Sequence, residues 1–305
     1  MAFVTQATIV GWLIYSALLS LMALGITLLY RTTKVANFAQ GSFVTVGAYV
    51  TYTLYIAVSR NPYIGAPVAF VLVGAIALVL YYTVLEPLRR RNAPTVMLMI
   101  ATLAFDTILF GVVNIHADYL TSTYKVPSRD VLLSGIDFKF MGQSGILFVA
   151  LGTLAACLVA LYVLLNYTTL GMALRASMEN PHLAEAVGIN VSMMLAVSWF
   201  IAGGLTGLAG ALIPLWTEIS PNIGMLLLAS MFCASIVGGL EQIYGAVLGG
   251  LLLGLVDIVG TSVLASLVGP WVTLYEPVIP LIVLSVTLIL APRGLAGVRV
   301  RRWKQ

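Results

Sequence analysis

The sequence predicts an all-α membrane protein, a polytopic bundle of about eight to ten transmembrane helices, some of them interrupted. Of its 305 residues, 61% are hydrophobic and only 9% are charged. Long apolar runs of so little charge are typical of transmembrane helices, which need about 20 residues each. Glycines also recur at four-residue spacing, as at Gly203 and Gly207, which lets helices pack closely in lipid. We expect residues 1–305 to form a single transmembrane domain.

Nine apolar segments give the preferred number of spans. They are Ile9–Tyr30, Gly41–Val58, Ala66–Leu85, Pro94–Ile115, Ser144–Leu165, Met193–Trp216, Met225–Leu240, Gly245–Ala265 and Val278–Ala291. The second, seventh and ninth segments are short for a full span. No Lys or Arg precedes the first run, and that run is too long for the apolar core of a signal peptide. We therefore expect the first helix to be retained.

The distribution of Lys and Arg predicts the orientation, because cytoplasmic loops carry an excess of both. If Arg89, Arg90 and Arg91 face the cytoplasm, four alternate intervals hold 11 of the 15 Lys and Arg residues. These intervals are Arg31–Gln40, Glu86–Ala93, Asn166–Ser192 and Pro292–Gln305. We therefore expect an outside N-terminus, a cytoplasmic C-terminus and a multi-pass place in the cell membrane.

The stretch Gly171–Asn190 is the longest polar interval between apolar helices that still looks structured. Asn180 suits an N-cap, Pro181 the first helical position and Gly188 the position after the last turn. The resulting helix of roughly two turns is too short to be stable alone. It is either an amphipathic connector on the bilayer or a docking helix for a soluble partner. In the second case, the small residues Ala184 and Ala186 would let the partner's backbone come close.

The longest predicted outside loop spans residues 116–143 and mixes acidic with basic side chains. It is either a solvated connection or a docking surface for an extracytoplasmic protein.

Two places interrupt the apolar pattern with glycines and polar side chains. One is Asn37–Gly47, which carries Gln40 and Ser42, and the other is Gly238–Gly250, which carries Glu241 and Gln242. Irregular backbone at membrane depth is tolerated where protein covers it or where it lines a watery cavity. Paired interruptions also point to a transport site. Both stretches are therefore candidate pathway segments, and two ordinary cytoplasmic turns remain the alternative.

Asp106 and Asp257 are the acidic residues well inside predicted spans. A carboxylate in hydrocarbon is costly and normally faces a cavity or a partner group. Either residue could bind a coupling ion or a substrate ammonium, as in an ion-coupled secondary carrier. Alternatively, each is protonated or paired with a neighbouring Thr or Ser, which also suits a structural membrane protein with no pathway.

The sequence lacks the motifs of nucleotide binding, metal binding and catalysis. The sequence has no phosphate-binding G-x-x-x-x-G-K-[ST] loop and no H-E-x-x-H motif. The two histidines, His116 and His182, fall on opposite predicted sides of the membrane, which excludes a joint metal site. Cys157 and Cys233 fall mid-span, where packing is their expected role. We expect no cofactor, no catalysis by this chain and no nucleic-acid partner.

Several blocks together resemble the permease subunits of branched-chain amino-acid (LIV-type) ABC importers. The blocks are A-L-G-I-T-L-L-Y at Ala23–Tyr30, N-F-A-Q-G-S-F-V-T-V-G-A-Y at Asn37–Tyr49, G-M-A-L-R-A-S-M-E-N at Gly171–Asn180, A-V-G-I-N at Ala186–Asn190, I-S-P-N-I-G at Ile219–Gly224, G-A-V-L-G-G-L-L-L-G at Gly245–Gly254 and A-P-R-G-L-A-G at Ala291–Gly297. They occur in the family's order over nearly the whole chain.

The resemblance implies a subunit that pairs with a second permease, a copy of itself or a different chain, and with two cytoplasmic ATPases. It also implies an external solute-binding protein. Residues 166–192 would form the cytoplasmic coupling loop, with Glu179–Gly188 as the helix that fits into the ATPase. The implied coupling residues are Arg175, Glu179, Asn180, Leu183, Ala184, Glu185, Ala186 and Gly188.

The sequence departs from the family pattern at several positions. Gln40 stands where the family often has His, Met172 replaces an Arg, and Ser230 stands where relatives often carry Lys. Glu241 and Tyr244 alter the family's G-I-G-S-I-P-G block. Since these positions lie near the implied pathway, the substrate stays open among branched-chain amino acids, urea, short amides and other small polar solutes.

Overall fold

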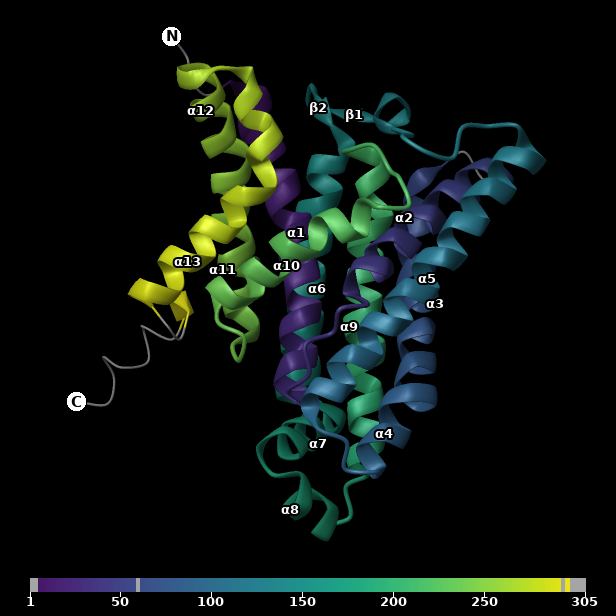
Figure 1. Cartoon of the computed structure of the whole chain (residues 1–305), viewed down its shortest axis with the longest axis vertical. Helices are drawn as coiled ribbons and strands as arrows, with labels where there is room; N and C mark the ends of the chain where they lie inside the picture. The colour runs from purple at the N-terminus through teal and green to yellow at the C-terminus, as the bar shows by residue number, and fades with distance from the viewer. Residues whose placement is uncertain (1–4, 59–60, 292–293, 297–305) are drawn as a thin grey trace.

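The computed structural model describes residues 5–58, 61–291 and 294–296, and this part of the chain is helical apart from one small hairpin (Figure 1). The longer helices are α1 (Gln6–Thr33), α2 (Gln40–Ala57), α3 (Gly65–Leu80), α5 (Thr95–Tyr124), α6 (Gly145–Tyr167), α9 (Val191–Leu212), α10 (Ile223–Gly238), α11 (Ile243–Gly254) and α13 (Ile279–Leu290). The predicted all-α class is confirmed.

Short elements join these helices. They are α4 (Glu86–Arg90), α7 (Thr169–Glu179), α8 (Pro181–Ala186), α12 (Thr261–Val268), the 3-10 turns η1 (Pro62–Ile64), η3 (Ser134–Ile136), η4 (Ile213–Leu215) and η6 (Pro270–Val278), and the π-helical turns η2 (Tyr81–Leu85) and η5 (Leu255–Gly260). The strands β1 (Lys139–Phe140) and β2 (Gln143–Ser144) pair antiparallel, with Lys139 opposite Ser144.

Within the described residues, six helical runs are long and apolar enough to cross a membrane. They are Gln6–Thr33, Pro62–Arg90, Thr95–Tyr124, Gly145–Tyr167, Val191–Leu215 and Ile243–Val268. The helices α10 and α13 are apolar but shorter. The chain is therefore a polytopic membrane helix bundle. Eight of the nine predicted segments coincide with these runs and shorter helices, and the remaining one, Gly41–Val58, coincides with α2. The number of crossings stays a prediction.

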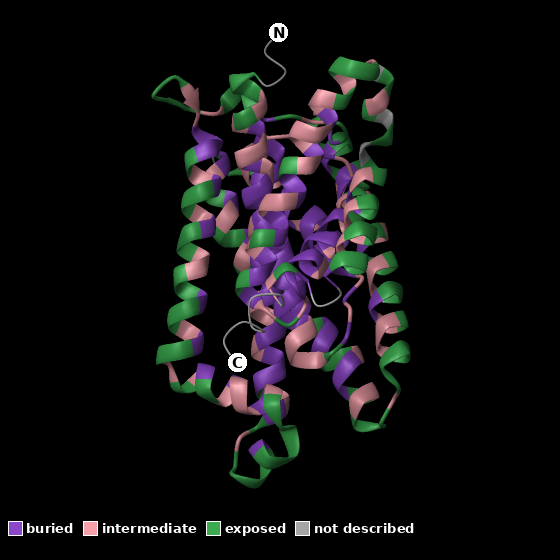
Figure 2. Cartoon of the chain, turned by 90° about the vertical axis from the view of Figure 1, so that its left-hand side faces the viewer, coloured by how far each residue is buried: buried purple, intermediate pink, exposed green. Residues whose placement is uncertain are grey.

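The core of the bundle is α1 and α9, which lie largely buried while the outer helices expose apolar side chains (Figure 2). Small residues allow the close approach of their neighbours. A Cβ on Gly203 of α9 would lie 2.6 Å from the Cβ of Ala77 on α3, and one on Gly207 would lie 2.5 Å from the Cβ of Val73. The predicted role of these glycines in close packing is confirmed.

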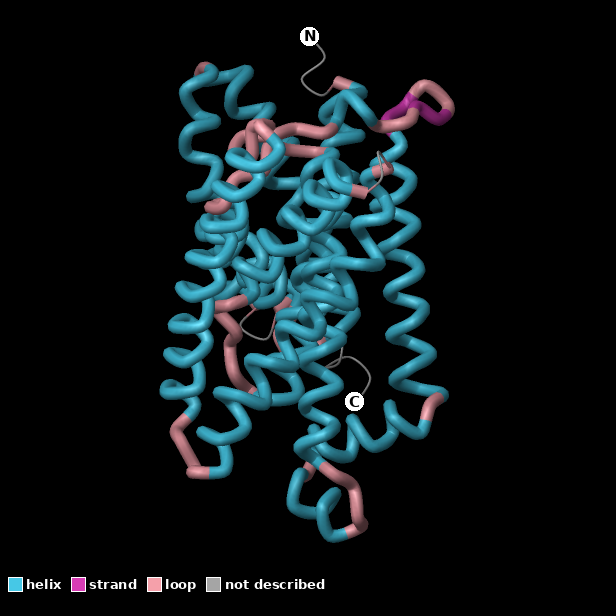
Figure 3. Tube along the Cα trace, turned by 90° about the vertical axis from the view of Figure 1, so that its right-hand side faces the viewer, coloured by secondary structure: helices cyan, strands magenta, loops and turns pink. Residues whose placement is uncertain are grey.

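Loops lie at the two ends of the bundle, and further loop segments lie between its helices (Figure 3). The hairpin β1–β2 lies at the end where α1 begins, and α8 projects from the opposite end (Figure 1). One predicted boundary was wrong. Residues 116–124, placed in the outside loop, continue α5, because the helix extends past the apolar run. The polar stretch before Asn180, which looked structured but was assigned no element, forms the helix α7.

Most of the basic C-terminal interval Pro292–Gln305, including Arg299, Arg301, Arg302 and Lys304, lies outside the described residues. The same holds for Arg60.

Candidate functional site

The segment that projects from the bundle consists of α7 and α8, and we call residues 169–190 the coupling segment. α8 begins as its sequence predicts: the Asn180 side chain accepts a hydrogen bond from the Leu183 backbone N at 3.1 Å, and Pro181 follows. Gly188 has φ +88°, a backbone conformation that favours glycine. The implied helix Glu179–Gly188 corresponds to α8 with shorter ends, since Glu179 is the last residue of α7, and Val187 and Gly188 follow α8.

The coupling segment is fixed to the bundle at its root. Gly171 sits where α7 folds back on α6, and a Cβ there would lie 2.7 Å from the Cα of Leu165. Ser177 on α7 is buried. Ala184 is only 2% exposed, so it faces the chain itself and not a partner, contrary to the expectation for this residue. Arg175 is half-buried on α7.

The outer side of α8 and the residue directly after it carry apolar side chains that no described part of the chain covers. Leu183 is 63% exposed and Val187 is 70% exposed. Glu185 and Ala186 lie beside them and are also exposed. Exposed apolar side chains at the tip of a projecting segment are typical of a docking surface.

A buried carboxylate ties the segment after α8 to α4. Glu86, 5% exposed, accepts hydrogen bonds from the Ser192 hydroxyl and the Tyr81 hydroxyl, both at 2.8 Å. It also pairs with Arg89 at 3.3 Å and Arg90 at 2.9 Å. Our sequence reasoning missed Glu86. The spacing E-P-L-R-R, which places two arginines three and four residues later on one helix face, is the signal that was available.

The first predicted break is an interruption inside the bundle. After α1 ends, residues 34–39 run back into the bundle before α2 begins (Figure 1). Gln40 reaches Gly25, since a Cβ on Gly25 would lie 2.7 Å from the Gln40 Nε2 atom. Because an α-helix rises about 1.5 Å per residue, Gly25 lies roughly 12 Å before the end of α1. α2 therefore starts within the bundle.

Polar side chains form hydrogen bonds with the backbone and with each other at the start of α2. Asn37 donates from Nδ2 to Gln40 Oε1 at 2.9 Å, and its Oδ1 accepts from the Ala39 N at 3.1 Å. Gln40 in turn donates to the Thr206 hydroxyl on α9. Asn37 and Gln40 are at most 1% exposed, so here they hold the interruption in place and do not line an open channel.

A second helix also starts inside the bundle, and it is not at the predicted break. Between α9 and α10, residues 213–222 fold back, and α10 begins against α2. The Gly224 N donates to the Thr45 hydroxyl at 3.1 Å. The stretch Gly238–Gly250 is instead the end of α10, a turn at residues 239–242 and most of α11. The sequence S-P-N-I-G at the start of α10 shares only its glycine with N-F-A-Q-G at the start of α2. The sequence alone therefore did not show that these two helix starts correspond.

The first turns of α2 and α10 meet, and we call this place the helix-start junction. A Cβ on Gly41 would lie 2.8 Å from the Gly224 carbonyl oxygen. Asp106 of α5 lies beside it: its Oδ1 accepts from the Ser42 N, and its backbone oxygen accepts from the Ser42 hydroxyl, both at 3.2 Å. Helix N-termini carry partial positive charge, so the junction combines two such ends with one carboxylate.

Asp106 is only half-buried, although it lies on α5 between apolar side chains that are exposed, among them Leu103 and Ile108. A carboxylate on the apolar face of a membrane helix requires something other than lipid in front of it. The backbone N of Ser42 at the start of α2 supplies one such group.

The turn after α10 carries the last predicted pathway residues. Glu241 is exposed and pairs with Lys34, just past α1, at 2.6 Å. The hydrogen bond from the Lys34 ammonium, more than any other interaction, holds the pKa of the Glu241 carboxyl below its usual value. Gln242 is half-buried beside it.

Asp257 lies apart from the helix-start junction, on the π-helical turn η5. It is 2% exposed, and its Oδ2 accepts from the Tyr15 hydroxyl of α1 at 3.4 Å. The structure therefore does not bring the two intramembrane aspartates together. In the described part of the chain, no three His, Cys, Asp or Glu side chains gather as metal ligands would.

The bundle, the two helices that start inside it and the projecting coupling segment define a multi-pass membrane transport protein. Residues 8–292 match the family described as "Branched-chain amino acid transport system / permease component". The chain therefore belongs to this family, and it is the permease component of an ABC transport system, not itself an enzyme.

Curated relatives cover nearly the full length. A probable branched-chain amino acid transport permease protein LivH of Methanocaldococcus jannaschii is 45% identical over 97% of this chain and 93% of its own. The high-affinity branched-chain amino acid transport system permease protein LivH of Escherichia coli is 26% identical over 91% of both chains. BraD of Pseudomonas aeruginosa, with the same description, is 25% identical over 91% of both chains. No solved structure matches the chain.

Proposed function

We propose that this permease imports branched-chain amino acids, with ATPase subunits acting on it through α8. The observation that carries the coupling role is the tip of α8, where Leu183 and Val187 are exposed beyond the ends of the long helices. Two apolar side chains four residues apart form one helix face. A groove on a soluble ATPase subunit would cover this face.

The root of the coupling segment suits transmission of a movement. Ser192, directly after it, is hydrogen-bonded to Glu86, and Glu86 holds Tyr81 on the π-helical turn η2. A displacement of α8 would therefore reach both α9 and the α3–α4 run. The ATPase must bind two states of the permease with different affinity, since otherwise no population shifts.

The helix-start junction is the proposed substrate site. The partial positive charge of the α2 and α10 N-termini suits an α-carboxylate, as in transporters whose broken helices point at anionic groups. The Asp106 carboxylate suits the α-ammonium of the same molecule. This pairing favours an amino acid over urea or a short amide, because those solutes carry no full charges.

In this proposal, the second permease subunit packs along α5. The half-buried Asp106 and its apolar neighbours would then face the partner and a shared pathway instead of lipid. The charge distribution supports nine crossings, with the N-terminus outside and α8 in the cytoplasm. The end that holds β1–β2 and residues 125–144 would then receive an external solute-binding protein.

The test is reconstitution. The permease would be purified in mild detergent from cells that also make its ATPase subunits, then placed in proteoliposomes with a leucine-loaded binding protein. We expect co-purification of the ATPase and leucine uptake that requires ATP. Uptake by the isolated permease in an ion gradient would favour an ion-coupled carrier that uses Asp106 and Asp257. No contact between these two residues supports that alternative.

A further inference from the structure

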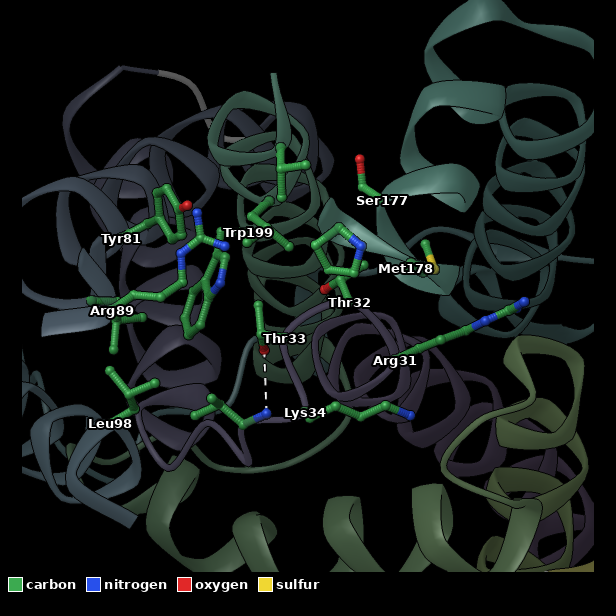
Figure 4. Close-up of a pocket in the computed structure, with 15 residues that line it drawn as sticks. Arg31, Thr32, Thr33, Lys34, Tyr81, Arg89, Leu98, Ser177, Met178 and Trp199 are labelled. Atoms are coloured by element: carbon green, nitrogen blue, oxygen red, sulfur yellow. Dashed lines mark hydrogen bonds between the residues drawn. The ribbon is translucent and has the colours of Figure 1, made fainter. Parts of the chain in front are cut away.

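A pocket of about 320 Å³ lies between the coupling segment and the bundle (Figure 4). Ser177, Met178 and Pro181 form the wall on the coupling-segment side. The opposite walls come from the end of α1, from η2 and α4, from the start of α9 and from Leu98 of α5. The size is at the lower end of the range for small-molecule pockets, roughly 300 to 1,000 Å³. The helix-start junction contributes none of the lining residues.

The lining of this pocket is apolar with an excess of positive charge. Leu85, Leu98, Val191 and Leu195 are among the apolar lining residues. The cations are Arg31, Lys34 and Arg89. Lys34 is paired with Glu241, and Arg89 shares Glu86 with Arg90. Arg31 makes no ion pair among the described residues. The cations around the pocket therefore outnumber the carboxylates that contact them, which favours an anionic ligand.

The floor of the pocket holds a hydrogen-bond donor that lacks an acceptor. Trp199 lines the pocket and is fully buried, and in the described structure its Nε1 has no hydrogen-bond partner. A buried donor without an acceptor is costly. Figure 4 shows Arg89 extending toward Tyr81 and Trp199, whereas Arg31 and Lys34 extend toward the other side. A carboxylate near the floor would supply the missing acceptor for the indole and a partner for the guanidinium.

We propose that this pocket binds a small carboxylate with a branched aliphatic body, which enters from the side of the coupling segment. The guanidinium of Arg89 and the indole N–H of Trp199 bind the carboxylate, and the leucines and valine surround the body. The lining residues come from α1, η2, α4, α5, α7, α8 and α9, and protein on so many sides favours a dissolved molecule over a membrane lipid. An occupant would hold Pro181 and Ser177 against α1 and α9, and so restrict the coupling segment.

The transported amino acid is one member of this chemical class, and that identification rests on the proposed function. The 2-oxo acid with the same carbon skeleton is the other. Recognition of the anion and its apolar body does not depend on what is transported.

The experiment measures equilibrium binding of radiolabelled 4-methyl-2-oxopentanoate to the permease–ATPase complex in nanodiscs, without nucleotide or binding protein. This probe has no ammonium, so it lacks the group that Asp106 would bind. We expect saturable binding that is about tenfold weaker in Arg89→Gln and about fivefold weaker in Trp199→Phe. Trp199→Phe removes the N–H and keeps the packing, which covers the case in which Arg89→Gln does not fold. Arg91→Gln, an exposed neighbour outside the lining, is the matched control and should bind as the wild type does.

Competition identifies the recognised groups. Leucine should displace the probe, whereas 3-methylbutylamine and inorganic phosphate should not. Absence of saturable binding, or equal affinity in both variants and the wild type, would overturn the site. Displacement by phosphate would overturn recognition of the aliphatic body, and failure of leucine to compete would overturn its link to the transported class. Because uptake is measured separately, binding can fail while ATP-driven uptake persists, and the reverse.

Discussion

Gly41 and Gly224 touch backbone to backbone at the centre of the bundle, each at the second position of its helix. The contact is reciprocal: a Cβ on either glycine would meet the carbonyl oxygen of the other. Reciprocal contact of this kind is the signature of a local two-fold relation. Here it relates the first turns of α2 and α10.

This contact leaves no room for a side chain. We predict that Gly224→Ala destabilises the protein by about 2 kcal/mol, since a methyl group would press on backbone that cannot rotate away. The measurement is the unfolding midpoint of the purified permease in detergent. Gly111→Ala on α5 is the control, because a Cβ there meets nothing within 4 Å. An equal effect of the two substitutions would contradict the close contact.

The substitution Asp106→Asn tests the charge of Asp106 separately from its hydrogen bonds. Asp106→Asn keeps a side-chain oxygen that can accept from the Ser42 N, so stability should stay unchanged. Loss of the negative charge should lower leucine uptake at limiting loaded binding protein by about tenfold, if this carboxylate binds the substrate ammonium.

Asp118→Asn is the matched control for this substitution, because Asp118 is exposed and pairs with Arg129. Wild-type uptake by Asp106→Asn would remove Asp106 from the substrate site and assign it to packing.

The coupling role predicts an uncoupled variant. Glu185→Arg, on the exposed side of α8, should abolish ATP-driven uptake while leaving the permease in the membrane. Gly188→Pro should do the same, since proline cannot adopt a φ of +88°. The readouts are uptake in proteoliposomes and the amount of ATPase that co-purifies.

Gly142→Pro in the turn between β1 and β2 is the control for Gly188→Pro, because this glycine also has a positive φ, +78°. It lies at the other end of the bundle, so it should leave the ATPase bound. The coupling assignment would be lost if both glycine variants retained uptake.

The Lys34–Glu241 pair predicts a pH dependence. A carboxyl whose pKa is lowered by folding stabilises the folded state above its ordinary pKa, about 4.3, and that contribution is lost as the pH falls through the lowered pKa. Since both side chains are exposed, we expect no more than about 1 kcal/mol. Glu241→Gln should therefore lower the unfolding midpoint slightly at pH 7, and the difference should shrink at acid pH.

Glu218→Gln, an exposed glutamate without an ion pair among the described residues, should show no such difference at pH 7. A wild-type midpoint for Glu241→Gln at pH 7 would show that the pair contributes nothing.

The local pattern was enough to predict the helices and the start of α8. The apolar runs predicted the helical segments. Asn180, Pro181 and Gly188 predicted the ends of the short helix, because helix caps depend on neighbouring residues alone. The interruption at Asn37 was also visible, since amides and glycines stand out between apolar runs.

What could not be predicted depends on contacts between distant parts of the chain. The start of α10 is defined by its packing on Thr45 and Gly41 of α2. The residues S-P-N-I-G do not indicate how deep in the bundle this helix begins. The burial of Ala184 likewise depends on how α8 packs against α7 and α9. For Asp106 and Asp257, the sequence could not say that they occupy separate places, because this follows from helix packing.

The π-helical turn η5 gives the chain near Asp257 a way to accommodate a change of one residue in length. An α-helix turns about 100° per residue, so adding or removing one residue rotates everything beyond that point by the same angle. A π-helical turn absorbs one extra residue, and a deletion between Leu255 and Gly260 can therefore be taken up by reversion to regular helix. Between related permeases, single-residue length differences in this stretch should leave α12 in place and change only the direction of the aspartate.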